Sequence, residues 1–137
     1  MECIAVSACL LGYHCKYDGG ENLNPDVIAY CKGKVIIPIC PEVFGGLSTP
    51  RVESEITPEG LVVSRHGEDV TRYFERGARV TWELLKQHHC TKAILKDGSP
   101  SCGYTTIYDG TFSHAKKSGL GVTARFLKEK GVTFIDL

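Results

Sequence analysis

Long apolar runs and an excess of either charge are both missing from this sequence of 137 residues. Apolar runs such as residues 35–39 are far short of the ~20 residues that a bilayer-spanning helix needs. Because 16 Lys and Arg residues balance 16 Asp and Glu residues, the composition indicates neither a polybasic nucleic-acid surface nor a membrane-surface binder. The first residues, Met-Glu-Cys-Ile-Ala-Val, lack the basic start of a signal peptide, so we expect a cytoplasmic protein.

Cysteine pairs of the Cys-x-x-Cys type are also missing, although the chain has seven cysteines. Their absence leaves zinc ribbons, thioredoxin-like redox sites and ferredoxin-type cluster runs without support. A disulfide framework is not expected either, because the number is odd and 137 residues can bury a core without cross-links. In a reducing compartment such cysteines are more often metal ligands, catalytic thiols or small packing residues.

The seven cysteines fall into two groups by their surroundings in the sequence. Three lie in or beside stretches that we expect to form strands and helices, where a free cysteine packs as a small hydrophobe: Cys3, Cys31 and Cys90. The other four lie in loops rich in Gly, Pro, Ser and charged residues: Cys9, Cys15, Cys40 and Cys102. Metal binding or catalysis is favoured for this loop group.

Strand and helix patterns alternate along the chain, and no repeat or linker marks a domain boundary. Apolar runs predict strands at 3–8, 35–39, 92–96 and 132–135, and helix signals predict helices at 25–31, 71–89 and 122–130. Small hairpins are expected at 55–65 and at 105–114, the second turning at Asp109-Gly110, and a loop is expected at 40–51. This order predicts a single α/β domain over residues 1–137, with a mostly parallel, Rossmann-like sheet flanked by helices and carrying small hairpin insertions.

The functional loops of a parallel sheet gather outside the carboxyl ends of its strands. Cys9 follows the first predicted strand, Cys40 the second and Cys102 the third, so we expect these distant thiols at one edge of the sheet. Glu42, close to Cys40, is a candidate general acid or base, and Ser101, next to Cys102, is a candidate for orienting or protonating a substrate. The simpler alternatives are a solvated loop carboxylate and a turn residue after a proline.

The chain also contains several longer motifs, which include these cysteines and occur in a fixed order. The chain has Ser-Ala-Cys-Leu-Leu-Gly-x-x-Cys-Lys-Tyr-Asp-Gly from residue 7 and Cys-Pro-Glu-x-x-Gly-Gly-Leu-x-Thr-Pro-Arg from residue 40. It then has Lys-x-x-Ser-Pro-Ser-Cys-Gly from residue 96, Tyr-Asp-Gly-Thr-Phe from residue 108 and Gly-x-Gly from residue 119. Together the motifs resemble the thiouracil desulfurase (TudS-like) family of small bacterial proteins over nearly the whole chain.

The resemblance implies a [4Fe-4S] cluster that is held by only three cysteines. The implied ligands are Cys9, Cys40 and Cys102, and Cys15 is the rival for a place in the trio. Three thiolates leave one iron without a protein ligand, and such an iron is a soft Lewis acid suited to sulfur. The implied reaction is the non-redox removal of sulfur from a thiolated pyrimidine such as 2-thiouracil. A cluster of this kind is prone to oxidative loss, so we expect aerobically prepared protein to lack it.

The resemblance also assigns Glu42 and Ser101 to the substrate side of the cluster, with a small thiolated nucleobase or nucleoside as the partner. The zero net charge suits an uncharged base better than a tRNA. Two alternatives stay open from the residues alone. One is a thiol-based enzyme that uses Cys9 or Cys102 as its nucleophile, and the other is a metal- or cluster-binding module without catalysis.

Overall fold

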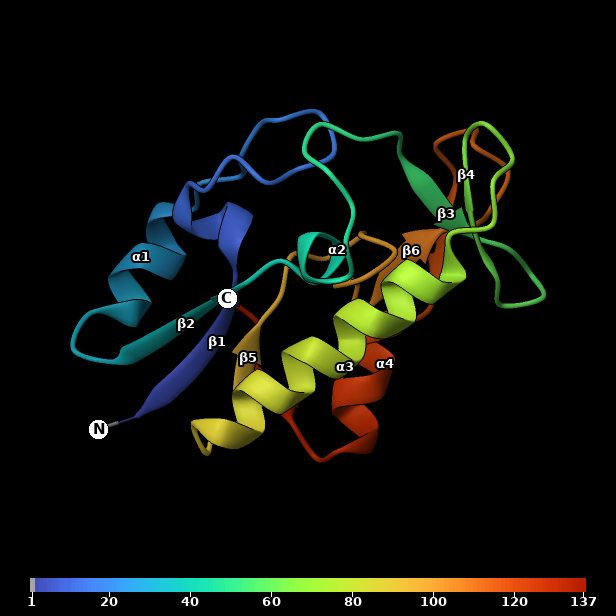
Figure 1. Cartoon of the computed structure of the whole chain (residues 1–137). Helices are drawn as coiled ribbons and strands as arrows, with labels where there is room; N and C mark the ends of the chain where they lie inside the picture. The colour runs from blue at the N-terminus through green and yellow to red at the C-terminus, as the bar shows by residue number, and fades with distance from the viewer. Residues whose placement is uncertain (1) are drawn as a thin grey trace.

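A four-stranded parallel sheet forms the centre of the molecule (Figure 1). The structure is a computed structural model and describes residues 2–137. The strand order is β2-β1-β5-β8, with the bounds Cys3–Ser7 for β1, Val35–Ile39 for β2, Lys92–Ile94 for β5 and Thr133–Phe134 for β8. All neighbours are parallel, and Ala5 of β1 is in register with Ile37 of β2 and Ala93 of β5. The predicted α/β class with a parallel sheet is confirmed.

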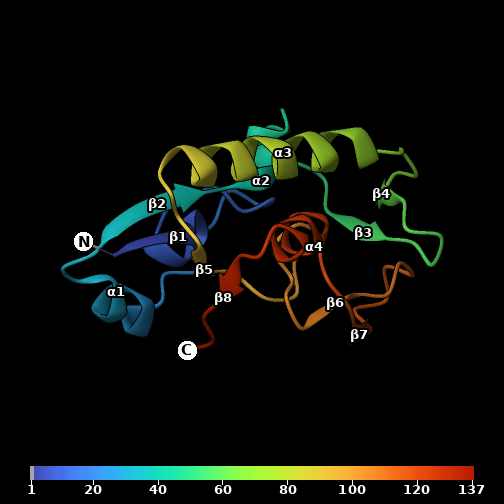
Figure 2. The same ribbon diagram turned by 90° about the horizontal axis from the view of Figure 1, so that it is seen from below.

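Helices cover both faces of the sheet (Figure 2). On one face lies α1, and on the other lie α3 and α4; their bounds are Pro25–Cys31, Thr71–Gln87 and Val122–Glu129. Side chains of β1 alternate between the faces, so that Ile4 and Val6 pack in the cluster that includes α1, whereas Ala5 packs in the cluster that includes α3 and α4. Both faces are therefore shielded from water, as is usual for parallel sheets.

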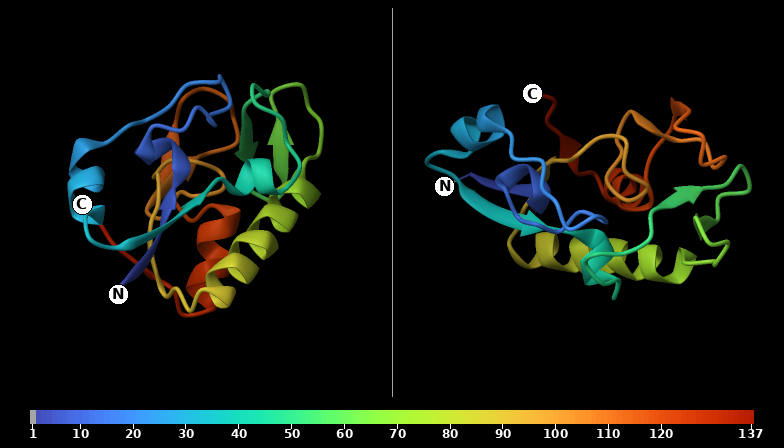
Figure 3. Two further views of the ribbon diagram at one scale, coloured as in Figure 1. Left: turned by 60° about the vertical axis from the view of Figure 1, so that its left-hand side comes forward. Right: turned by 90° about the horizontal axis from the view of Figure 1, so that it is seen from above.

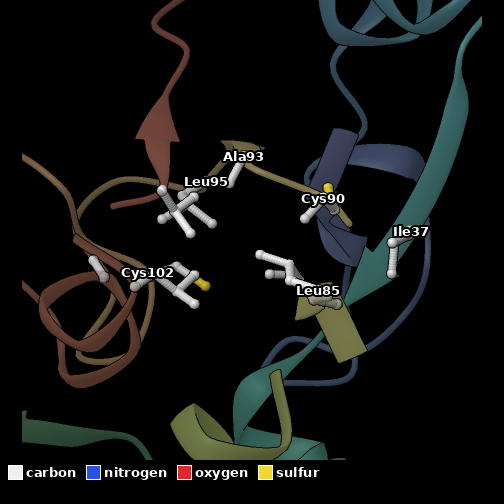
Figure 4. Close-up of a cluster of buried hydrophobic side chains, with 11 residues drawn as sticks. Ile37, Leu85, Cys90, Ala93, Leu95 and Cys102 are labelled. Atoms are coloured by element: carbon white, nitrogen blue, oxygen red, sulfur yellow. The ribbon is translucent and has the colours of Figure 1, made fainter. Parts of the chain in front are cut away.

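The core between the sheet and helices α3 and α4 is the larger of the two buried clusters. Leu85 of α3, Ala93 of β5 and Leu127 of α4 are fully buried in it. Two cysteines belong to this core, Cys90 just before β5 and Cys102 after it (Figure 4). The two thiols therefore lie toward opposite ends of one strand, which separates their surroundings.

The helix ends follow the signals in the sequence. Asn24 caps α1, because its Oδ1 accepts hydrogen bonds from the N–H groups of Asp26 at 3.0 Å and Val27 at 3.3 Å. Pro25 occupies the first helical position, and Gly131, with a φ of 87°, follows α4 as predicted. Helix α3 ends at residue 87 rather than 89. In residues 2–137, no helix has both the length and the apolar character that crossing a membrane requires.

Two antiparallel hairpins lie on the same side of the molecule (Figure 3). They pair β3 with β4 and β6 with β7, which have the bounds Ser54–Ile56, Val62–Ser64, Thr106–Tyr108 and Lys116–Ser118. The first hairpin is as predicted, but the two-residue turn at Asp109-Gly110 is wrong, because the register joins Tyr108 to Lys116 and leaves residues 109–115 as the connection. The physical reason is tertiary, since N–H groups of this connection bind a side chain of β3 instead of pairing across the hairpin.

A short helix, α2 (Pro41–Phe44), lies in the stretch 40–51, for which the sequence predicts a loop throughout. That prediction is wrong at these four residues. Cys40 has extended backbone at the N-cap, Pro41 occupies the first position, and Glu42 lies in the first turn, where a carboxylate favours the helix dipole. These signals are local, but a helix this short needs tertiary contacts to be stable, and its contact with α3 supplies them.

Candidate functional site

Three cysteines follow three neighbouring strands of the sheet. Cys9 lies in a 3-10 turn, η1 (Ala8–Leu11), directly after β1; Cys40 directly follows β2; and Cys102 lies in the loop after β5. Strand β2 lies on one side of β1, and β5 lies on the other side, so the chain changes direction across the sheet at β1. Ligands of α/β folds bind outside the carboxyl ends of the strands where the chain changes direction in this way. All three thiols line one pocket of about 310 Å³, together with Cys15. The predicted gathering of the three distant thiols at one edge is therefore observed.

Hydrogen bonds fix the loop that carries Cys102. Ser99 Oγ accepts the N–H of Ser101 at 3.0 Å and that of Cys102 at 2.9 Å, and the first N–H groups of α4 donate to carbonyls of the same loop. Asp97 Oδ1 accepts three backbone N–H groups from residues 104–106. Burial raises the pKa of Asp97, but these bonds and the hydroxyl of Thr105 outweigh it and hold the pKa well below its usual range.

The contact between α2 and α3 fixes Cys40 and Glu42. A Cβ atom at Gly77 of α3 would lie 1.9 Å from the carbonyl oxygen of Pro41, and one at Gly45 would lie 1.9 Å from a carbonyl oxygen of α3. Only glycine at both positions lets the two backbones touch. The position of α2, and with it the position of two candidate site residues, therefore depends on these two glycines.

Cys9 and Cys15 belong to the loop that follows β1. Asn22 Nδ2 lies 3.5 Å from Cys9 Sγ and donates to it, and the Asn22 N–H donates to the Cys9 carbonyl at 2.9 Å. The carbonyl oxygen of Cys15 lies 3.7 Å from Cys40 Sγ and accepts Nη2 of Arg51 at 2.9 Å. Cys15 therefore lies beside Cys40 and is held there by an arginine.

Glu42 and Ser101 are in direct contact although 59 residues separate them in the sequence. Ser101 Oγ donates to Glu42 Oε2 at 2.8 Å, and Arg51 Nε donates to Glu42 Oε1 at 3.1 Å. The side chain of Glu42 is 16% exposed and that of Arg51 is 7% exposed, so this ion pair is largely shielded from water. Glu42 is thus not a freely solvated loop carboxylate, and both predicted residues line the pocket that the cysteines line.

Arg51 is a site residue that sequence reasoning missed. Its guanidinium binds Glu42 and the Cys15 carbonyl, and its Nη1 also donates to the Ser48 carbonyl and the Thr49 hydroxyl, both at 3.1 Å. The sequence held one signal, because this arginine closes the motif that begins with Cys40. Arginine rarely loses contact with water unless its charge is paired, but the sequence did not reveal that this one is buried.

Burial favours the protonated form of the pocket thiols. It raises the pKa of Cys102 to about 12, against a smaller opposing effect of neighbouring hydroxyls. It also raises the pKa of Cys9, and it raises the pKa of Cys15 to about 12, to which the neighbouring Cys40 adds. A nucleophilic cysteine needs the opposite, a pKa lowered by a nearby cation or helix N-terminus. These surroundings disfavour a thiol-based enzyme that uses Cys9 or Cys102.

Comparisons with known proteins agree with this arrangement. The family described as 2-thiouracil desulfurase matches residues 4–136. The chain belongs to this family. An uncharacterized protein of Bacillus subtilis (strain 168), YbbK, is 40% identical over 142 residues, covering 97% of this chain and 94% of the relative. A solved structure described as the [4Fe-4S]-dependent thiouracil desulfidase TudS matches with a TM-score of 0.90 and 40% identity, over 98% of this chain and 89% of that one. The family predicted from the motifs is confirmed.

The donor set of this member of the 2-thiouracil desulfurase family fits an iron–sulfur cluster better than a single ion. In the part of the chain that the structure describes, no three His, Cys, Asp or Glu side chains converge as the ligands of one metal ion must. A [4Fe-4S] cluster does not need that convergence, because each thiolate binds a different iron and the cysteines stand apart around it. Cys9, Cys40 and Cys102 come from three separate loops around one pocket, and thiolates are the ligands that such clusters take.

Proposed function

We propose that this chain is an iron–sulfur enzyme that removes sulfur from a thiolated pyrimidine such as 2-thiouracil, giving uracil and sulfide without net oxidation or reduction. The observation that carries the proposal is a single pocket. It is lined by thiols that follow three different strands and by the hydrogen-bonded pair Glu42 and Ser101. Membership of the 2-thiouracil desulfurase family and 40% identity to a [4Fe-4S]-dependent thiouracil desulfidase support it. The whole chain, residues 1–137, then acts as one desulfurase domain.

Cys9, Cys40 and Cys102 are the residues that would hold the cluster, and Cys15, beside Cys40, is the rival ligand. Binding requires the thiols to lose their protons. Their raised pKa values make this deprotonation costly, and the bonds from sulfur to metal offset that cost. When bound by three thiolates, a [4Fe-4S] cluster supplies one iron without a protein ligand, a soft Lewis acid that attracts the sulfur of a thiocarbonyl and weakens its bond to carbon.

Glu42 acts in this proposal as the proton acceptor for an attacking water, and Ser101 orients that water. In the overall reaction, water adds to the thiocarbonyl carbon, a carbon–oxygen bond forms, the carbon–sulfur bond breaks, and sulfur leaves as sulfide. A water that is hydrogen-bonded to Glu42 Oε2 and Ser101 Oγ can pass a proton to the carboxylate while its oxygen attacks. Arg51 holds the other carboxylate oxygen at 3.1 Å and fixes the orientation of the group.

The directions of the hydrogen bonds support this division of roles. Ser99 Oγ accepts two backbone N–H groups, which leaves its own hydrogen to donate to Ser101 Oγ at 2.9 Å. Ser101 then donates to Glu42 and keeps one lone pair for a water or a substrate N–H group. The series Ser99, Ser101, Glu42 therefore leaves the carboxylate as the final acceptor, which is the form that a general base requires.

The partner in this proposal is a small thiolated nucleobase or nucleoside. A volume of about 310 Å³ is in the range of pockets that enclose small ligands. Zero net charge gives no general attraction for nucleic acid. The proposal assigns the enzyme to the cytoplasm, where cysteine thiols stay reduced and able to bind a cluster.

The test is an anaerobic purification followed by two measurements on the same sample. We expect iron and acid-labile sulfide in the amounts of one cluster per chain, and we expect sulfide release when 2-thiouracil is added. Bound iron without sulfide release from any thiolated pyrimidine would favour a cluster-binding module without catalysis. Failure to bind iron even after anaerobic reconstitution would refute the desulfurase proposal.

A further inference from the structure

Four carboxylate side chains line the pocket: two of them have both oxygens hydrogen-bonded, and a third forms an ion pair. Both oxygens of Glu42 are hydrogen-bonded, and both oxygens of Asp97 accept bonds from residues 104–106. Glu53 forms an ion pair with Arg65. The fourth carboxylate, Glu55, has different surroundings.

Glu55 lies in β3 and is only 7% exposed. Its Oε1 accepts the N–H of Gly110 at 3.0 Å and the N–H of Phe112 at 3.1 Å. Within residues 2–137, no donor lies at hydrogen-bond distance from its Oε2, and no cationic side chain lies at ion-pair distance from the group. One oxygen of this buried carboxylate is therefore anchored, and the other is left for the pocket that Glu55 lines.

The two hydrogen bonds to Oε1 also fix the direction in which Oε2 points. Gly110 has a φ of 95°, and a Cβ atom there would lie 2.8 Å from the carbonyl oxygen of Ile56, so the connection 109–115 rests directly on β3. The two hairpins that meet here stand apart from the four-stranded sheet (Figures 1 and 3), and residues of both hairpins line the pocket together with the cysteines. The pocket thus has a second wall, with a carboxylate oxygen held by the backbone.

A carboxylate oxygen accepts hydrogen bonds and cannot donate them, so a ligand that covers the free Oε2 must offer a donor. Leaving such an oxygen without a donor in a water-free site is costly. The ring of 2-thiouracil carries two N–H groups, one on each side of its thiocarbonyl carbon. A ring bound with its sulfur toward the cysteines can therefore turn an N–H group toward another wall.

We propose that Glu55 is a specificity-determining residue whose Oε2 accepts a hydrogen bond from a ring N–H group of the thiolated base. This inference rests on the proposed function and names how its substrate is recognised. The site then selects bases that carry a hydrogen on the recognised ring nitrogen. A base that is methylated at that nitrogen covers this oxygen without giving it a partner and binds poorly.

The substitution Glu55→Gln isolates the free oxygen. Its carbonyl oxygen can still accept the N–H groups of Gly110 and Phe112, whereas the free oxygen becomes an NH₂ group that donates and cannot accept. We expect kcat/KM for 2-thiouracil to fall on the order of 10- to 100-fold, mainly through KM, with an unchanged iron content. The matched control is Glu59→Gln, which changes an exposed carboxylate in the turn of the same hairpin, outside the pocket, and is expected to change KM by less than about twofold.

A second series uses substrates and does not depend on the variant folding. The wild-type enzyme is compared on 2-thiouracil, 1-methyl-2-thiouracil and 3-methyl-2-thiouracil. We expect one methyl isomer to lose on the order of 10- to 100-fold in kcat/KM and the other to lose much less. In Glu55→Gln the penalty for the sensitive isomer is expected to disappear, because methylation and substitution remove the same hydrogen bond.

Binding of the product gives a readout that is independent of turnover. Uracil carries the same ring N–H groups, and we expect its Kd for the cluster-loaded protein to rise on the order of 10-fold or more in Glu55→Gln but not in Glu59→Gln. Equal turnover of all three substrates by the wild-type enzyme, or wild-type KM and uracil Kd in a folded Glu55→Gln, would overturn the inference. If the wild-type protein releases sulfide in either case, the proposed function stands and only the role of Glu55 fails.

Discussion

Cys90 and Cys102 are equally well buried, at 2% and 4% exposure, yet their surroundings at the two ends of β5 differ. Cys90 Sγ lies 3.3 Å from the carbonyl oxygen of Cys3 and 3.4 Å from that of Lys92, so its single S–H has acceptors within the protein itself. Cys102 instead follows Ser101 in the loop at the carboxyl edge and lines the pocket. Burial raises the pKa of both thiols, so neither burial nor acidity distinguishes them. The two cysteines differ instead in their position, because Cys90 precedes β5 and Cys102 follows it at the carboxyl edge.

The largest expected effect tests this comparison directly. Replacing Cys9, Cys40 or Cys102 singly with serine should lower iron content at least about tenfold and abolish sulfide release, because a lost thiolate removes a cluster ligand. Cys31→Ser, in the packing group, should keep full iron content and lower the free energy of unfolding by about 1–2 kcal/mol, since it buries a hydroxyl in an apolar cluster. Iron content after anaerobic reconstitution and chemical unfolding curves are the measurements.

Cys15→Ser is the informative intermediate case, because Cys15 lies in the pocket beside Cys40. Normal iron content would assign it to loop structure or to the handling of sulfide. Iron loss equal to that of Cys40→Ser would make it a ligand. Equal iron loss in Cys31→Ser and Cys40→Ser would mean that the division of the cysteines into two groups is wrong.

The next effect concerns chemistry at the carboxyl edge without loss of the cluster. Glu42→Gln keeps the size of the side chain and an acceptor for Arg51 but removes the proton-accepting carboxylate. We expect full iron content and a loss of about 10²-fold or more in kcat, the usual scale of general acid–base help. Ser101→Ala should give the same pattern with a smaller loss. Wild-type turnover by Glu42→Gln across the pH profile would exclude Glu42 as the proton-transfer group.

A smaller effect is expected from the contact that holds Cys40 and Glu42 in place. Alanine in place of glycine inside a helix normally stabilises it by about 1 kcal/mol. At Gly77 the added Cβ would meet the Pro41 carbonyl at 1.9 Å, so Gly77→Ala should instead lower the free energy of unfolding by about 1–3 kcal/mol and reduce iron content. The exposed Val80→Ala in the same helix is the control and should leave iron content unchanged. Stabilisation by Gly77→Ala with full iron content would show that α2 does not depend on this contact.

The smallest effect tests the loop that carries Cys102. Because the folded-state pKa of Asp97 is lowered by hydrogen bonds, the ionised form stabilises the fold above the unfolded pKa near 3.9. Asp97→Asn should therefore lower the free energy of unfolding by about 1 kcal/mol at pH 7. The difference from the wild type should shrink as pH falls below about 4, because the Asp97 carboxylate of the unfolded wild-type chain then takes up a proton while that of the folded protein stays ionised. Unfolding curves at pH 7, 4 and 3 measure it, and a difference that does not change with pH would point to a neutral packing effect.

The sequence by itself determined the parts of this protein that depend on local pattern. Strands and helices agree with the runs and caps that predicted them, as Asn24 and Gly131 show. Loops gather at the carboxyl ends of parallel strands, so a parallel sheet in which each of Cys9, Cys40 and Cys102 follows a strand was enough to predict that these thiols share one edge. The ordered motifs were enough to identify the family.

Only the tertiary structure decided which side chains from separate segments meet. Helix α2 is too short to be expected from propensity, and it exists where two glycines let it touch α3. The pairing of Arg51 with Glu42 and the anchoring of Glu55 by the connection 109–115 have no periodic signal, since each joins segments whose approach is set by the packing of the whole chain. The hydrophobic pattern of a sequence indicates which face of its own helix or strand a residue lies on. The distance between two elements depends instead on every backbone and side chain that packs between them.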